Sequence, residues 1–169
     1  MGLEMISIVT GVGPRVGTSY IMNEARKAGL PIMGKKHLKG LTIKKHNQSG
    51  YWELDPYIIP QLAATNALDG YIIKMWSQGL KLLDPNSIGA AVIIERKDKQ
   101  AQLNSMYKVW KDEIKTKVGS LFSDLSVETI YNNHLEALNN YKFNSVLYVY
   151  TEDLTSRTKE ILNYLERGL

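Results

Sequence analysis

A cluster of residues that can bind an anion lies near the start of the chain. Arg15 lies between Gly13 and Gly17, and Thr18 and Ser19 follow directly. A guanidinium can contact two phosphate oxygens at once, and the N–H groups at the start of a helix favour an anion. Glycines let the backbone turn sharply and approach a ligand closely. The segment therefore predicts a phosphate-binding loop, in preference to a tight turn whose glycines serve only the backbone.

Two more cations follow apolar, β-branched runs that have the character of buried strands. Lys74 lies in the run 70–76, and Arg96 ends the run 88–96. In an open parallel sheet, ligands bind beyond the carboxyl ends of the strands. We therefore expect the glycine loop, Lys74 and Arg96 to lie along one edge of a sheet. For Lys74, a strand-end lysine in solvent is the competing interpretation.

Strand and helix patterns alternate along the chain, which predicts one domain over residues 1–169. The expected fold is a P-loop NTPase-like, three-layer α/β domain with a mainly parallel sheet flanked by helices. Residues 29–50 show no sustained periodicity and are expected to form a long connection. The expected strands are 5–10, 70–76, 88–96 and 144–150, and the expected helices are 20–28, 55–63, 98–118, 130–138 and 158–165.

The composition limits the classes of function. The 169 residues include no cysteine, which excludes disulfides, thiol nucleophiles and cysteine-bound zinc. His37, His46 and His134 lack the spacing of metal ligands, so no metal site is predicted. The net charge is +4 and the pI is about 9.1. Five lysines between 35 and 45 fit a solvated loop or a polyanionic small ligand at least as well as nucleic acid, which we consider an unlikely partner.

Three other polar residues are expected to serve the structure. His134 lies on a helix, where a satisfied surface or core histidine is favoured over a catalytic one. Glu152 and Asp153 precede the last helix, and capping of that helix and salt bridging within the domain are favoured for them.

No apolar run approaches the roughly 20 residues that a membrane helix needs, and no leader-like segment begins the chain. A soluble, intracellular, cytoplasmic protein without a membrane partner is therefore expected.

The segment Pro14-Arg15-Val16-Gly17-Thr18-Ser19 resembles the Pro-Arg-Ser-Gly-Thr-Ser loop of sulfotransferases. That loop holds the 5′-phosphate region of 3′-phosphoadenosine-5′-phosphosulfate (PAPS). Val16 replaces a serine of the family, and Val12 stands in register with its leading glycine. The loop also lacks the lysine of the Walker A motif, because Thr18 follows Gly17 directly. The resemblance implies that the co-substrate is bound by Gly13, Pro14, Arg15, Val16, Gly17, Thr18 and Ser19.

A second segment resembles the part of the family that binds the 3′-phosphate, where a strand ends in arginine and the next helix bears a serine. Arg96 and Ser105 have these positions. The interval between them is one residue longer than usual, whereas Lys97 to Ser105 fits it, so Lys97 is the alternative cation. The order of elements matches the family from Met5 to Leu169, and the chain looks like its short bacterial or viral members.

The resemblance implies transfer of a sulfuryl group from PAPS to a hydroxyl or amine acceptor, leaving 3′-phosphoadenosine-5′-phosphate (PAP), with no metal required. Arg15 and Lys74 would neutralise charge in the transition state. Trp76 stands where many members have a histidine base, so Glu53, His37 or His46 are the candidate bases.

The alternatives are a P-loop small-molecule kinase and a non-catalytic relative that binds a nucleotide or a phosphorylated partner. Neither the acceptor nor the oligomeric state follows from the sequence.

Overall fold

The computed structural model describes residues 5–33, 54, 57–113 and 126–169. Within them, five parallel strands form one sheet in the order β2-β3-β1-β4-β5. The strands are β1 (Ile6–Gly11), β2 (Ile32–Met33), β3 (Ile72–Lys74), β4 (Ile88–Glu95) and β5 (Val146–Tyr150). The α-helices are α1 (Thr18–Lys27), α3 (Ile59–Ala64), α4 (Lys99–Glu113), α5 (Val127–Asn140) and α6 (Leu154–Glu166), and short 3₁₀ helices are η1 (Ser77–Leu82), η2 (Pro85–Ser87) and η4 (Thr151–Asp153).

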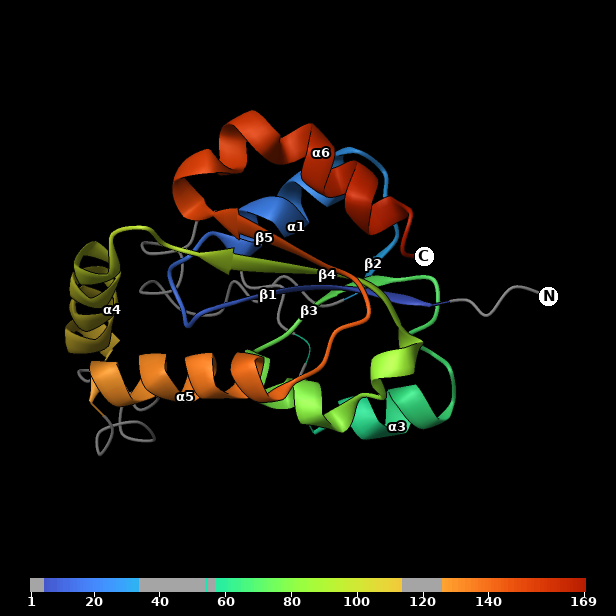
Figure 1. The fold of residues 1–169 in the computed structure, drawn as a ribbon, viewed down its shortest axis with the longest axis horizontal. Coiled ribbons are helices and arrows are strands. Elements are labelled where there is room, and N and C mark those ends of the chain that lie inside the picture. Colours follow the sequence, from blue (N-terminus) through green and yellow to red (C-terminus); the bar gives the residue numbers. More distant parts are fainter. Residues whose placement is uncertain (1–4, 34–53, 55–56, 114–125) are drawn as a thin grey trace.

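Helices cover both faces of the sheet, as the alternating sequence pattern predicts. α1 and α6 lie on one face, and α3 and α5 lie on the other (Figure 1). α4 follows the carboxyl end of β4 and packs against α5. None of the described helices combines the length and the apolar character that a membrane-spanning helix requires.

The two faces of β1 belong to different hydrophobic cores. Ile8 packs in the core beneath α4 and α5, while its neighbour Val9 packs in the core beneath α1 and α6. Successive side chains of a strand point to opposite faces, so a strand buried on both sides is continuously apolar. This is why residues 6–9 and 88–94 were recognisable as strands from the sequence.

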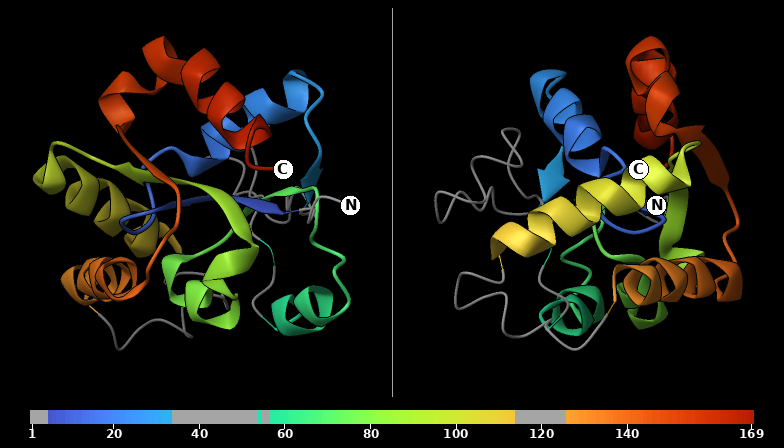
Figure 2. Two further views of the ribbon diagram at one scale, coloured as in Figure 1. Left: turned by 45° about the vertical axis from the view of Figure 1, so that its right-hand side comes forward. Right: turned by 90° about the vertical axis from the view of Figure 1, so that its left-hand side faces the viewer.

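The direction of the connections reverses between β1 and β4 at the carboxyl edge of the sheet. From β1 the chain turns to α1 on one face, whereas from the neighbouring β4 it continues to α4 and α5 on the other side (Figure 2). Adjacent strands whose connections leave toward opposite faces form the ligand-binding crevice of open α/β sheets. The loop between β1 and α1 lies at this point.

The strand β2 was not predicted. Ile32 and Met33 pair in parallel with Ile72 and Ile73 of β3, in a stretch expected to be an irregular connection. Two residues are too few for a periodic pattern to show.

Candidate functional site

The loop between β1 and α1 alternates in the sign of φ. Gly13, Arg15 and Gly17 have φ angles of 82°, 69° and 98°, whereas Pro14 and Val16 between them are not in the positive range. Positive-φ residues that alternate with negative-φ residues can turn successive N–H groups toward one concave side, which is an anion-binding arrangement. Arg15 adopts this conformation although it is not glycine.

Side chains from outside the loop donate hydrogen bonds to three of its carbonyl groups. The Nε2 group of Gln102, in α4, donates hydrogen bonds to the carbonyl oxygens of Val12 at 2.6 Å and Pro14 at 2.9 Å. The Oγ1 hydroxyl of Thr151, in η4, donates to the carbonyl oxygen of Val16 at 2.6 Å. The carbonyl groups of every second residue from Val12 to Val16 are thus bonded to side chains of other elements.

Three amide groups at the end of the loop and the start of α1 donate no hydrogen bond to any residue that the structure describes. The N–H groups of Val16, Gly17 and Thr18 donate to no other group in the described part of the chain. They lie at or directly before the N-terminal end of α1, where the helix dipole also favours negative charge.

Two predicted cations lie beside the loop. Lys74 is 4% exposed, and its Nζ donates to the Ser19 hydroxyl at 2.7 Å. Lys74 ends β3 and is paired in register with Val9 of β1, which brings it to the loop. The Nε of Arg15 donates to the hydroxyl of Ser105 at 3.2 Å, so Ser105 of α4 also reaches the site.

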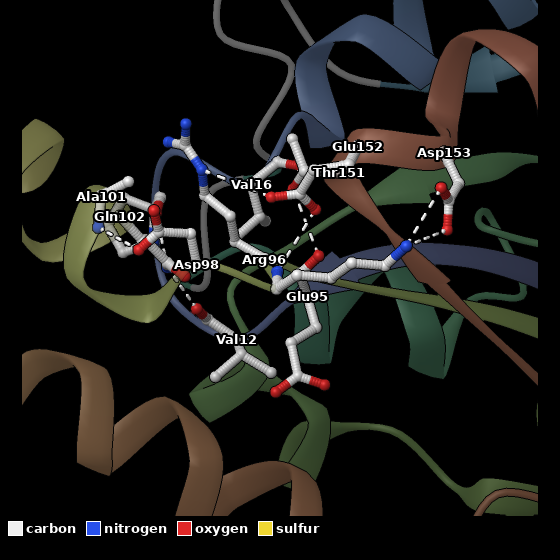
Figure 3. Close-up of polar contacts among 12 residues, drawn as sticks. Val12, Val16, Glu95, Arg96, Asp98, Ala101, Gln102, Thr151, Glu152 and Asp153 are labelled. Atoms are coloured by element: carbon white, nitrogen blue, oxygen red, sulfur yellow. Dashed lines mark hydrogen bonds and ion pairs between the residues drawn. The ribbon is translucent and has the colours of Figure 1, made fainter.

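The other two predicted cations form ion pairs in the structure (Figure 3). The Nε of Arg96 lies 3.9 Å from a carboxylate oxygen of Glu152, and the Nζ of Lys97 lies 3.1 Å from one of Asp153. Ser105 therefore bonds to Arg15, and neither alternative cation bonds to it. The ion pairs agree with the salt bridging predicted for Glu152 and Asp153, although Asp153 makes no side-chain cap of α6.

The carboxylate of Glu152 is stabilised in its charged form. Desolvation would raise its pKa, but hydrogen bonds from its own N–H and from the N–H groups of Lys97 and Asp98, together with the charge of Arg96, lower the pKa overall. Arg96 is therefore paired with an ionised carboxylate at neutral pH. An anionic ligand at Arg96 would have to compete with it.

A histidine is buried next to the loop. His134 of α5 is 3% exposed and forms a 2.6 Å hydrogen bond between its Nδ1 and the Oγ of Ser77. Its ring lies 5.2 Å from that of Trp76, and its Cδ2 lies 3.9 Å from the position a Cβ would take at Gly13. Burial lowers the pKa of His134 to about 4, so the ring is neutral at pH 7. Of the two structural roles that the sequence favours for His134, the structure shows the core one.

The candidate bases Glu53, His37 and His46 lie outside the described residues. Among the residues that are described, no three His, Asp or Glu side chains lie close enough together to hold a metal ion.

Gln102 and Thr151 are the site residues that sequence reasoning missed. A usable sequence signal existed for Gln102, because it is a polar residue directly before the apolar Leu103 and one turn before Met106. The structure shows that all three residues are buried. Comparison of the chain with protein-family models, curated proteins and solved structures gives no match.

Proposed function

We propose that the chain binds a phosphorylated adenosine at the β1–α1 loop and transfers a sulfuryl group from PAPS to a hydroxyl or amine acceptor. The loop geometry supports the first part: φ is positive at every second residue from Gly13 to Gly17, and three loop carbonyls accept hydrogen bonds from Gln102 and Thr151. The likeness of residues 14–19 to a PAPS-binding loop supports the second part.

The cations beside the loop fit the charge changes of sulfuryl transfer. In an in-line transfer, the acceptor atom forms a bond to sulfur while the bond from sulfur to the phosphate oxygen breaks. That oxygen keeps the electron pair, and the acceptor gives its proton to a base. Lys74 and Arg15, which lie beside the loop, would neutralise the oxygen that becomes charged. Thr18 and Ser19 would bind the 5′-phosphate.

The 3′-phosphate would bind at the next part of the same edge, beside β4. Arg96 or Lys97, together with Ser105, would supply its contacts. Because Arg96 is paired with Glu152 and Lys97 with Asp153, the phosphate would take the place of a carboxylate. A dianion that accepts several hydrogen bonds is a stronger partner for a guanidinium than one exposed carboxylate.

Calorimetric titration with PAP, with ATP and Mg²⁺, and with adenosine 5′-phosphate tests the binding step. PAP should bind most tightly and without Mg²⁺. Arg15→Ala should weaken PAP binding by about 10- to 150-fold, since a hydrogen bond to a charged group contributes about 1.5–3 kcal/mol. Arg167→Ala is the matched control, because Arg167 is exposed and follows the end of α6, near the opposite edge of the sheet.

Turnover of labelled PAPS with a panel of hydroxyl and amine acceptors tests the transfer step. Binding of PAP without turnover of PAPS would identify a non-catalytic binder. Tighter binding of ATP than of PAP, with a requirement for Mg²⁺, would contradict the proposal and favour the kinase. Equal PAP affinity in Arg15→Ala and the parent chain would contradict the assigned site.

A further inference from the structure

Gln102 occupies a fixed and fully buried position between α4 and the loop. Its exposed fraction is 0%. The first turn of α4 is held by the Asp98 carboxylate, which accepts the N–H of Ala101 at 2.8 Å. Figure 3 shows the Gln102 side chain directed at the loop, with its hydrogen bond to the Val12 carbonyl drawn. The side chain therefore meets the loop from the face opposite to α1.

The two carbonyls determine which way the amide group of Gln102 is turned. Its NH₂ group has two hydrogens, and each is used, one on Val12 and one on Pro14. Its oxygen, Oε1, is buried and has no hydrogen-bond partner among the described groups. A buried acceptor without a donor destabilises the fold. An apolar side chain of similar shape would avoid this cost, so the amide is unfavourable here unless the carbonyls require it.

The loop backbone also approaches the Gln102 amide closely at Gly13. A Cβ at Gly13 would be 3.3 Å from Nε2 of Gln102, and the φ of Gly13 is 82°. The backbone at Gly13 thus approaches the Gln102 amide directly, and a shift of either one displaces the other.

We infer that Gln102 is a positioning residue: by bonding the carbonyls of Val12 and Pro14 it fixes the loop with its N–H groups facing the anion. The inference rests on the proposed phosphate site and extends it to a residue that touches no ligand. Without the amide, the two carbonyls lose their donors and can rotate. A carbonyl oxygen turned to the concave side repels an anion, so affinity falls.

Stability and affinity should respond differently to removal of the amide. Gln102→Met keeps the approximate shape of the side chain, leaves two carbonyls without donors and removes the orphaned Oε1. Loss of the two donors should lower the free energy of unfolding, whereas removal of the unpaired Oε1 should raise it, so the two changes oppose each other. The change in loop shape has no such offset, so phosphate affinity should fall by about tenfold or more, as expected for loss of one well-placed charge-assisted contact.

The test compares Gln102→Met with Gln100→Met in the full-length chain. Gln100 is exposed on the same helix and bonds to Asn104, away from the loop. Affinity for inorganic pyrophosphate and for PAP is measured by calorimetry well below the melting temperature. Hydrogen exchange of the amides of Val12 and Gly13, which donate to the carbonyls of Ile94 and Gly11, is measured without ligand. We expect weaker binding of both anions and faster exchange in Gln102→Met, with Gln100→Met unchanged.

The two proposals fail in different ways. If the parent chain binds neither pyrophosphate nor PAP, the proposed function is wrong. If exchange of the loop amides is the same in Gln102→Met as in the parent chain, the role of Gln102 is wrong whatever the parent binds. A drop in melting temperature with unchanged affinity and exchange would show a merely structural residue. If Gln102→Met does not fold, Gln102→Asn takes its place in the test. Its side chain is one methylene group shorter, which moves the amide away from the two carbonyls, and weaker anion binding and faster exchange are again expected.

Discussion

Replacing Gly17 by alanine tests the close approach between the loop and the start of α6. Gly17 has a φ of 98°, and a Cβ there would lie 2.5 Å from Cδ1 of Leu154. Real Cβ atoms do not come so close to another carbon, so Leu154 or the loop must move. Gly29 offers a control, because its φ is 77° and nothing lies within 4 Å of the position that a Cβ would take there.

The cost of each substitution can be worked out separately. A non-glycine residue in the left-handed region costs about 1–2 kcal/mol, and both variants incur it. Forcing extra volume into a packed site costs about 1–3 kcal/mol more, and this applies to Gly17→Ala alone. Gly17→Ala should therefore lose about 2–5 kcal/mol of unfolding free energy and Gly29→Ala about 1–2 kcal/mol. For a chain of this size, each kcal/mol corresponds to roughly 2–4 °C in melting temperature.

Urea denaturation followed by circular dichroism measures both losses. A double-mutant cycle with Leu154→Ala then isolates the contact, because the cost of Gly17→Ala should fall to that of Gly29→Ala once the Leu154 methyl is gone. The reasoning is refuted if Gly17→Ala and Gly29→Ala are equally destabilised, or if Leu154→Ala leaves the cost of Gly17→Ala unchanged.

Three further outcomes follow from the site. Arg15→Gly should have an unfolding free energy about 1 kcal/mol higher than that of Arg15→Ala, because glycine relieves the strain of a φ of 69°. Equal midpoints of the two variants in urea denaturation would contradict this. The buried His134 has a pKa of about 4, below the unfolded value near 6.5. The stability that follows from keeping His134 neutral is therefore fully present above pH 6.5 and is lost as the pH falls toward 4. The unfolding free energy should fall by about 2 kcal/mol between pH 7 and pH 5. His134→Gln should show a flatter dependence in urea titrations at the two pH values. Glu152→Gln should bind PAP up to about fivefold more tightly in calorimetry, since it removes an exposed competitor for Arg96; weaker binding would place the 3′-phosphate elsewhere.

The sequence predicted the elements whose signal is local. The β-branched run before Gly11 and the glycines after it specify a strand, a loop and a helix start without reference to the rest of the chain. The position of Lys74 beside the loop was predictable because neighbouring parallel strands end at the same edge of a sheet. In these cases, the position of the backbone decides where the functional group lies.

The side-chain partners were not predictable in the same way. The sequence predicts that Ser105 shares a phosphate with Arg96 or Lys97, but no signal in it indicates that the Ser105 hydroxyl accepts a hydrogen bond from Arg15, 90 positions earlier in the chain. A strand end fixes the Cα of Arg96, but its long side chain can reach any acceptor around that point. Glu152 is close enough because β5 lies next to β4 in the sheet. That adjacency is a property of the assembled fold.

The contacts that hold the loop come from both faces of the sheet, which has a consequence for binding. Gln102 reaches it from α4, and Thr151 reaches it from η4 at the start of α6. Thr151 also donates to the carbonyl of Glu95 at 3.2 Å, so one hydroxyl joins the loop to the end of β4. At its far end, α6 is fixed to β1 by the Ser7 hydroxyl, which donates to the carbonyl of Leu165 at 2.6 Å. If the loop binds an anion as proposed, a loop held in this way has its amides oriented before the ligand arrives. Binding then does not have to order the backbone, and more of the electrostatic attraction is expressed as affinity.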